Sequence, residues 1–431
     1  MPRRQETNVS SLLIPRFRVR HRARAPWCHQ VSRTQIGIVT TIGAVSLSGI
    51  RLRHMHDVLS GYVDRGELPG YVALVARHGA VQLDCAGYQR DAIFRLASMT
   101  KPIAAAAALI LVEEGVIRLD DRVDRHLPEL ADMRVLRTIS SPIDDTVPAS
   151  RPITLRDLLT FTLGTGMVIA PPDTYPIQEA RRRSLVEVGL GAKPDSSEYL
   201  RRLAGLPLVH QPGEVWMYDT GYDVLGILIS RASGRSFGEF LRERIFDPLG
   251  MPDSGFWVTP DKIDRLPTAY TPGDRSGELK VEDEAVGGRF SLPPGLESGA
   301  GGLVATVDDF LLFARMLLDH GAFPGGRILT RPTVAAMTSD QLSEDIKART
   351  PWTPGWFANN SWGFGVGVVT RRYDGTASPG AYGWNGGFGT TWRSDPTEDM
   401  VAILMTQVGG TAEVPRVFGD FVNLAYAAID D

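Results

Sequence analysis

Cysteine, lysine and long apolar runs are all scarce in this chain of 431 residues. Its two cysteines, Cys28 and Cys85, cannot form a disulfide framework, and neither has a metal-ligand spacing. A disulfide scaffold and a cysteine-based metal site are therefore excluded. No apolar run approaches the length of a membrane-spanning helix, and no internal repeat occurs.

Net charge is distributed unevenly along the chain. Residues 1–53 hold ten arginines and one acid, Glu6, a net charge of +9, so the rest of the chain carries about −13 of the total of −4. The mildly acidic net charge of residues 54–431 gives no indication of nucleic-acid binding.

The N-terminal segment differs in composition from the rest. Residues 1–35 are rich in arginine, without periodicity, which predicts disorder. The apolar run Ile36–Leu47 resembles part of a signal peptide but is followed by no clean cleavage site. We expect an extension over 1–50 and one domain over 51–431. The unpaired cysteines favour the cytoplasm, while the apolar run leaves export open.

Strand and helix signals alternate along the domain in three blocks. β-rich runs occur at Tyr71–Ala76, Val81–Tyr88, 362–371, 381–393 and 400–407, and helical patterns at Leu52–Val63, Ile153–Leu159 and Val307–Leu318. His78-Gly79 predicts a hairpin turn between the first two runs. We therefore predict an α/β fold, with an α/β part over 51–116 and 291–431 and a mainly helical lobe over 117–290.

The tetrapeptide Ser98-Met99-Thr100-Lys101 is the most informative feature. A serine three residues before a lysine shares its helical face, so the hydroxyl and the amine can meet. An apolar, β-prone stretch precedes the pair and an alanine-rich helix former follows it. This predicts a strand-to-helix junction, where the helix dipole favours a developing alkoxide. The pair is then a nucleophile with a built-in base.

Only five of the 46 basic residues are lysines, and Lys101 alone has a serine three positions earlier. Arginine cannot release its proton, so lysine is needed where a neutral amine is used. If Lys101 is a neutral base, its pKa is expected to be depressed. The local sequence fits a capping serine followed by a surface lysine equally well.

A second serine motif, Gly234-Arg235-Ser236-Phe237-Gly238, matches the G-x-S-x-G nucleophile elbow. That elbow needs a preceding strand, whereas a helical segment, Tyr222–Ala232, stands before this one. Ser236 and Glu239 instead form a capping box, so we interpret Ser236 as a helix cap.

Two further segments can complete a site around Ser98. In the loop Pro212–Tyr222, Tyr218 beside a lysine ammonium can carry protons, although a core tyrosine is equally compatible with the sequence. The run Tyr382–Trp392 holds four glycines among aromatics, which suits backbone lying against a ligand. Its main-chain N–H, with that of Ser98, can form an oxyanion hole; a bulge or tight hairpin explains the glycines as well.

In chain order, these pieces resemble the serine β-lactamase and penicillin-binding-protein superfamily, in its class C-like branch and closest to the family VIII carboxylesterases. Ser98 and Lys101 match its S-x-x-K motif. Tyr218-Asp219-Thr220 matches Y-x-N in part, and Trp384-Asn385-Gly386 matches the esterases' W-x-G. The resemblance covers about residues 52–427 and implies an antiparallel sheet flanked by helices, with no metal or cofactor.

The resemblance also implies roles for single residues. Ser98 would be the nucleophile, Lys101 and Tyr218 the shared base, and Gly387 an oxyanion donor beside Ser98. The substrate-binding residues it implies are Trp384, Asn385, Gly386 and Thr220.

Two departures from the pattern bear on the substrate. Thr220 replaces the usual asparagine, and Trp384 replaces the cation that holds a substrate carboxylate in lactamases and peptidases. Tryptophan can line an apolar pocket but cannot pair with an anion. We therefore expect hydrolysis of small neutral carboxylic esters. The alternatives are a β-lactamase or D-amino-acid-specific peptidase, and a non-catalytic ligand-binding protein of the same fold.

Overall fold

The computed structural model describes residues 47–186, 193–273, 278–372, 376–409 and 416–431. The predicted extension and Cys28 therefore lie outside the described residues, apart from the segment's last few positions. Leu47 is buried and forms a bridge with Ile429, and helix α1 (Gly49–Asp64) follows directly.

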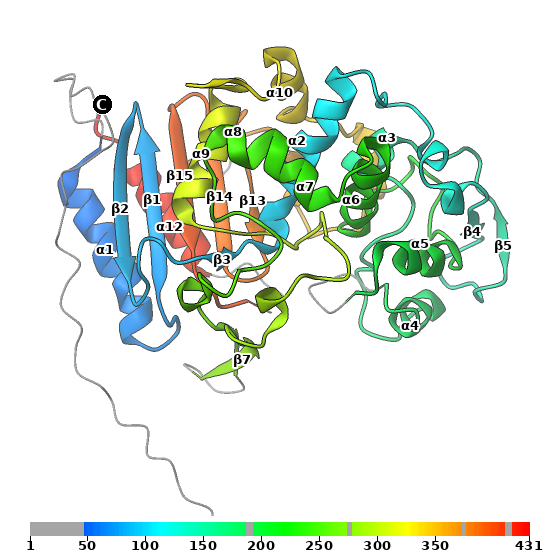
Figure 1. The fold of residues 1–431 in the computed structure, drawn as a ribbon, viewed down its shortest axis with the longest axis horizontal. Coiled ribbons are helices and arrows are strands. Elements are labelled where there is room, and N and C mark those ends of the chain that lie inside the picture. Colours follow the sequence, from blue (N-terminus) through cyan, green and yellow to red (C-terminus); the bar gives the residue numbers. More distant parts are fainter. Residues whose placement is uncertain (1–46, 187–192, 274–277, 373–375, 410–415) are drawn as a thin grey trace, which may run out of the picture. The chain divides into compact units, whose positions relative to one another are not determined.

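Strands from both ends of the domain form one seven-stranded antiparallel sheet (Figure 1). In spatial order they are β11 (Asn360–Trp362), β12 (Gly367–Val369), β13 (Tyr382–Gly386), β14 (Thr390–Asp395), β15 (Met400–Met405), β1 (Tyr71–Arg77) and β2 (Ala80–Ala86). The predicted β1–β2 hairpin is confirmed. Its turn residues, His78 and Gly79, have φ of 48° and 79°, the positive values that a tight hairpin turn requires.

Two predicted β-rich runs each contain two strands rather than one. The run 362–371 begins at the last residue of β11 and includes β12, and the run 381–393 covers β13 and most of β14. Gly365 and Gly389 have φ of 83° and 82°, so the chain turns at these glycines instead of continuing as a strand. The tight-hairpin interpretation of the glycine-rich run is thus correct.

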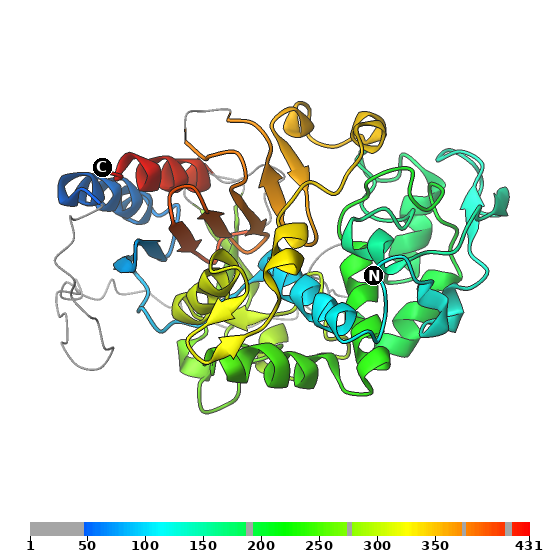
Figure 2. The same cartoon turned by 90° about the horizontal axis from the view of Figure 1, so that it is seen from above.

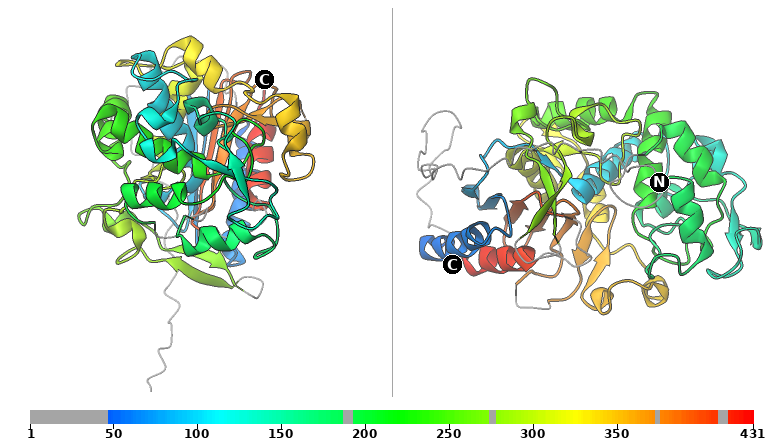
Figure 3. Two further views of the ribbon diagram at one scale, coloured as in Figure 1. Left: turned by 90° about the vertical axis from the view of Figure 1, so that its right-hand side faces the viewer. Right: turned by 90° about the horizontal axis from the view of Figure 1, so that it is seen from below.

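Both faces of the sheet are covered. All seven residues of β1 are buried, and alternate residues enter different cores: Ala73 and Val75 on one face, Val72 and Leu74 on the other. Helices α1 and α12 (Arg416–Ala427) lie side by side over the first face, as Figures 2 and 3 show. Helix α9 (Val307–Leu318) packs on the second face, with the bounds that the sequence predicts.

The segment between β2 and α9 contains most of the remaining helices. They are α2 (Thr100–Glu113), α3 (Leu155–Leu159), α4 (Pro176–Arg183), α5 (Ser196–Ala204), α6 (Thr220–Ser233), α7 (Phe237–Leu241) and α8 (Asp247–Leu249); α10 (Arg331–Met337) and α11 (Glu344–Arg349) follow α9. Thr154 caps α3 in a capping box with Asp157. Helix α2 packs on α6, so the helix that follows Ser98 lies against a helix from the segment predicted to form the helical lobe.

Four two-stranded sheets complete the described part of the chain. They are β3 (Phe94–Arg95) with β8 (Val304–Ala305), β4 (Arg134–Leu136) with β5 (Thr146–Pro148), β6 (Ala269–Pro272) with β7 (Leu279–Asp283), and β9 (Ala322–Phe323) with β10 (Gly326–Arg327). Two of them lie in the predicted helical lobe, which therefore also contains β-hairpins.

Candidate active site

Ser98 lies where a strand meets a helix, as the sequence predicts. The short strand β3 leads into a 3-10 turn, Ala97–Met99, and α2 follows at Thr100. Ala97 has a φ of 46°, which is uncommon for a residue with a side chain and marks a sharp turn just before the serine. Ser98 is partly exposed, whereas Ala97 and Met99 are completely buried. The turn therefore presents the Ser98 side chain alone.

Lys101 is completely buried, and its ammonium group lies among several oxygen atoms. Its Nζ donates to Ser98 Oγ at 2.9 Å and to the carbonyl of Ala300 at 2.6 Å, and it lies 2.6 Å from Oδ1 of Asp219. The Nζ also lies 4.5 Å from the centre of the Tyr218 ring. The predicted meeting of hydroxyl and amine is confirmed, and the surface-lysine alternative is wrong.

The expectation of a depressed pKa for Lys101 is wrong. Burial does lower the pKa of this amine, but the charge of Asp219 and the side chain of Tyr218 outweigh burial, and the pKa is raised above its ordinary value. The sequence motif could not reveal this, because Asp219 occupies the unspecified position of Y-x-N. The resting site thus holds Lys101 as an ammonium.

Tyr218 and Trp384 are joined by a hydrogen bond. The indole Nε1 of Trp384, on β13, donates to the Tyr218 hydroxyl oxygen at 2.7 Å. The two rings are tilted, with centroids 5.7 Å apart. Trp384 therefore gives Tyr218 a polar partner as well as an apolar wall, and a donor aimed at the phenol oxygen stabilises negative charge developing there.

Strand β13 lies beside the turn that carries Ser98. A Cβ on Gly386 would stand 2.2 Å from the carbonyl oxygen of Leu96, so only glycine permits this approach. The Thr390 hydroxyl donates to the same carbonyl at 3.0 Å and ties β14 to the nucleophile segment. Gly387 follows at the exposed start of the turn. Its predicted role as an oxyanion donor stays a prediction.

The other two predicted substrate-binding residues already have partners. Asn385 is half-buried, and its Oδ1 accepts from the Thr391 hydroxyl across the hairpin at 2.7 Å. Thr220 is 1% exposed and its hydroxyl accepts from Arg181 at 2.8 Å. Contact of either residue with a substrate stays a prediction, but the Thr220 side chain is held inside the helical lobe.

Aromatic rings that the sequence interpretation did not single out surround Tyr218. Trp352 lies 5.5 Å from Tyr218, and Trp356 lies 6.1 Å from Trp384, centroid to centroid. The rings in this aromatic cluster are Phe161, Trp216, Tyr218, Trp352, Trp356, Phe357, Trp362 and Trp384. Trp352 and Trp356 are half-buried. The only sequence signal for this cluster is the group of Trp and Phe residues between 352 and 357. Because these residues are far from Tyr218 in the sequence, their contact with Tyr218 could not be predicted.

Ser236 caps helix α7, as predicted. Its hydroxyl accepts from the N–H of Glu239 at 3.1 Å, and the Glu239 carboxylate accepts from the N–H of Ser236. The G-x-S-x-G match is therefore a capping box and not a nucleophile elbow.

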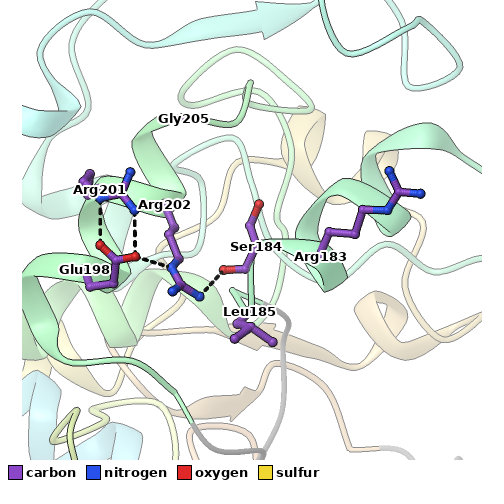
Figure 4. A pocket seen from close by; sticks show the side chains of 7 residues that line it. All are labelled: Arg183, Ser184, Leu185, Glu198, Arg201, Arg202 and Gly205. Carbon is purple, nitrogen blue, oxygen red and sulfur yellow. Dashed lines mark hydrogen bonds and ion pairs between the residues drawn. The ribbon is translucent and has the colours of Figure 1, made fainter.

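A pocket lies apart from these residues, between the end of α4 and helix α5 (Figure 4). Its lining includes Arg183, Ser184, Arg201, Arg202 and Glu198. Hydrogen bonds from Arg201 and Arg202 lower the pKa of Glu198 to about 2, so the carboxylate offsets part of the positive charge. None of the predicted site residues lines this pocket, and it lacks a nucleophile paired with a base.

Neither a metal-binding cluster nor a membrane-spanning helix occurs among the described residues. In those ranges no group of three or more His, Cys, Asp or Glu side chains is placed to hold a metal ion. No helix there is both long enough and apolar enough to cross a bilayer.

Comparisons with known proteins agree with this geometry. The beta-lactamase family model matches residues 55–425. Lovastatin esterase of Penicillium rubens is 32% identical, over 78% of this chain and 83% of that protein, and esterase EstB of Burkholderia gladioli is 31% identical, over 79% and 86%. The structure of EstCE1, described as a hydrolase with promiscuous acyltransferase activity, superimposes with a TM-score of 0.72 and 24% identity, covering 87% of this chain and 98% of that one.

Proposed function

The chain belongs to the beta-lactamase family of serine hydrolases, and we propose that it cleaves carboxylic esters through an acyl-enzyme on Ser98. Two relatives with more than 30% identity bear the name esterase, which supports ester chemistry. The substrate class expected is an ester whose acyl or alcohol part is uncharged and apolar.

The hydrogen bond from Trp384 to Tyr218 is the observation that carries the proposal. It places an indole, rather than an ammonium group, at the third motif beside the base. Aromatic rings surround this point, so a free substrate carboxylate would lose its hydration without gaining a cationic partner from Trp384. A neutral ester has no such penalty, which favours esters over β-lactams and peptides with a carboxylate.

The proposed reaction has two halves. Ser98 Oγ attacks the ester carbonyl carbon, its proton passes to the Lys101–Tyr218 pair after that pair has given up one proton to solvent, and the N–H groups of Ser98 and Gly387 hold the oxyanion. Collapse of the tetrahedral intermediate breaks the C–O bond, and the alcohol leaves with the transferred proton. A water molecule, deprotonated with the help of Tyr218, then attacks the acyl-enzyme. The acid departs and the proton returns to Ser98.

A β-lactamase or D-amino-acid-specific peptidase is the alternative within the family, and it uses the same nucleophile and base. It requires a cation that Trp384 does not supply.

A non-catalytic binding protein does not require a serine hydroxyl that is hydrogen-bonded to a buried lysine. The Ser98–Lys101 contact is therefore evidence against this second alternative.

The test compares turnover of p-nitrophenyl butyrate and of a chromogenic cephalosporin by the full chain. We expect efficient ester cleavage, little lactam cleavage, and loss of at least a thousandfold in kcat in Ser98→Ala. Faster lactam than ester cleavage would favour the alternative. Ester cleavage that survives in Ser98→Ala would refute the assignment of the nucleophile.

Ser236→Ala is the matched control, because it removes the serine hydroxyl from the G-x-S-x-G motif that forms a helix cap. Loss of a helix cap costs about 1 kcal/mol of stability. We therefore expect a lower Tm in Ser236→Ala with kcat/KM unchanged, whereas Ser98→Ala should lose activity and keep its Tm.

A further inference from the structure

The carboxylate of Asp219 forms an ion pair with Lys101 that the reaction proposed above does not use. The two groups meet at 2.6 Å, and their side chains are 0% (Lys101) and 7% (Asp219) exposed. A buried carboxylate is unfavourable unless it is paired, so this contact is a specific feature of the site rather than a surface ion pair.

Asp219 is one of the oxygen neighbours that hold the amine in place. An ammonium group has three N–H donors and no acceptor, and the Lys101 Nζ has Ser98 Oγ, the Ala300 carbonyl and Asp219 Oδ1 within 2.9 Å. The Tyr218 side chain also hydrogen-bonds to this amine. The Ala300 and Asp219 oxygens, both at 2.6 Å, fix the Nζ atom beside Ser98 and Tyr218.

The backbone of Asp219 is arranged for this contact. Asp219 stands at the N-cap of α6, where an aspartate usually accepts from the first helical N–H groups, yet its side chain makes no capping hydrogen bond. Its φ of 90° is a conformation that residues with side chains rarely adopt. The carboxylate is turned away from its own helix and toward Lys101.

Other charged groups lie near this loop, but they have partners of their own. Arg181, from α4, donates to the hydroxyls of Thr165 and Thr220. Asp223, on α6, is bound by Lys193 and lies next to the Tyr199 hydroxyl. Among the described residues, the phenol of Tyr218 is a further titratable neighbour of Lys101, whose amine lies over its ring. The Tyr222 hydroxyl on α6 donates to the Leu159 carbonyl.

We propose that Asp219 is a positioning residue of the catalytic centre, whose carboxylate holds the Lys101 amine against Ser98 and balances its positive charge. The idea rests on the proposed function in that Ser98 and Lys101 perform the reaction. Asp219 does not touch the substrate. Asp219 acts through Lys101, because its carboxylate fixes the position of the Lys101 amine and sets the pH range over which that amine stays charged.

A spectroscopic test does not depend on activity. With five lysines in the chain, selective ¹³C labelling of the lysine side chains gives a spectrum simple enough to assign. We expect the Lys101 signal to titrate above the ordinary range of a lysine in the unmodified protein and at least one pH unit lower in Asp219→Asn, because the largest influence that opposes burial is then removed. Unchanged titration of Lys101 in a folded Asp219→Asn protein would overturn the proposal, even if no ester were cleaved.

The kinetic test follows the acid limb of kcat/KM against pH. Loss of a neighbouring negative charge lowers the pKa of nearby proton donors, so the limb should move at least one pH unit lower in Asp219→Asn. Asp219→Glu, which keeps the charge, should restore most of the original position. Asp223→Asn is the matched control, because it neutralises a buried, lysine-bound aspartate four residues away. An equal shift in this control would overturn the specific role of Asp219.

Discussion

Replacement of Trp384 by phenylalanine isolates the indole N–H that reaches Tyr218. The change keeps an aromatic ring on β13 but removes the donor 2.7 Å from the phenol oxygen. A hydrogen bond to an oxygen that gains charge contributes about 1.5–3 kcal/mol. If the bond matters mainly in the transition state, kcat should fall about 10- to 100-fold with little change in KM.

The assay is steady-state hydrolysis of p-nitrophenyl butyrate, with Tm measured alongside. Trp362→Phe is the control, because it removes another buried indole N–H, which donates to the Leu159 carbonyl. That carbonyl keeps a second donor, the Tyr222 hydroxyl at 3.0 Å, so no acceptor is left unpaired. We expect a lower Tm in this control with kcat within a few-fold of the original.

An unchanged kcat in Trp384→Phe would refute the argument that the indole supports the base. A rise in KM alone would mean that Trp384 contacts the substrate as an apolar wall and does nothing for Tyr218. Equal losses of kcat in both variants would mean that the effect comes from the aromatic cluster as a whole.

Three other predictions concern single positions. Lys101→Arg should be as inactive as Lys101→Ala in kcat measurements, because the larger, planar guanidinium does not fit a completely buried site that holds a single ammonium nitrogen; a rate near normal would mean that any cation at this position suffices. Gly386→Ala should lower kcat at least a hundredfold in the same assay, because its Cβ would stand 2.2 Å from the Leu96 carbonyl and push β13 from Ser98; normal kcat would refute that packing. Burial raises the pKa of Asp309 from 3.8 to about 6, although hydrogen bonds such as that from Ser254 oppose the shift. The native state therefore binds the extra proton between these values, and stability from this group falls as pH rises through about 6. Thermal unfolding at pH 5 and pH 7 should show a loss of roughly 1 kcal/mol in the unmodified protein that Asp309→Asn lacks, and equal losses in both would refute the shift.

Much of the fold could be predicted because its signals are local. The helix Val307–Leu318, the hairpin turn at His78-Gly79 and the capping box at Ser236 all depend on residues within a few positions of one another. The division of the glycine-rich run into β13 and β14 was left open, since a strand with a bulge and a tight hairpin have similar glycine patterns.

The site was predictable to the extent that it resembles a family with motifs in a known order. Ser98 and Lys101 meet, and Tyr218 and Trp384 meet beside them, as the motif order implied. The aromatic residues between 352 and 357 were missed, because they belong to no motif and reach Tyr218 only through the folding of distant segments.

The sequence alone determined that Ser98 and Lys101 lie on the same side of the chain, because a spacing of three residues brings two side chains to one face of a helical turn. Only the tertiary structure decided the charge state of the Lys101 amine. Asp219 is more than one hundred positions away in the chain, and its carboxylate reaches Nζ because α6 packs on α2 and the backbone at Asp219 takes a φ of 90°. Local periodicity encodes the shared face, whereas the contact with Asp219 depends on how two buried helices fit together.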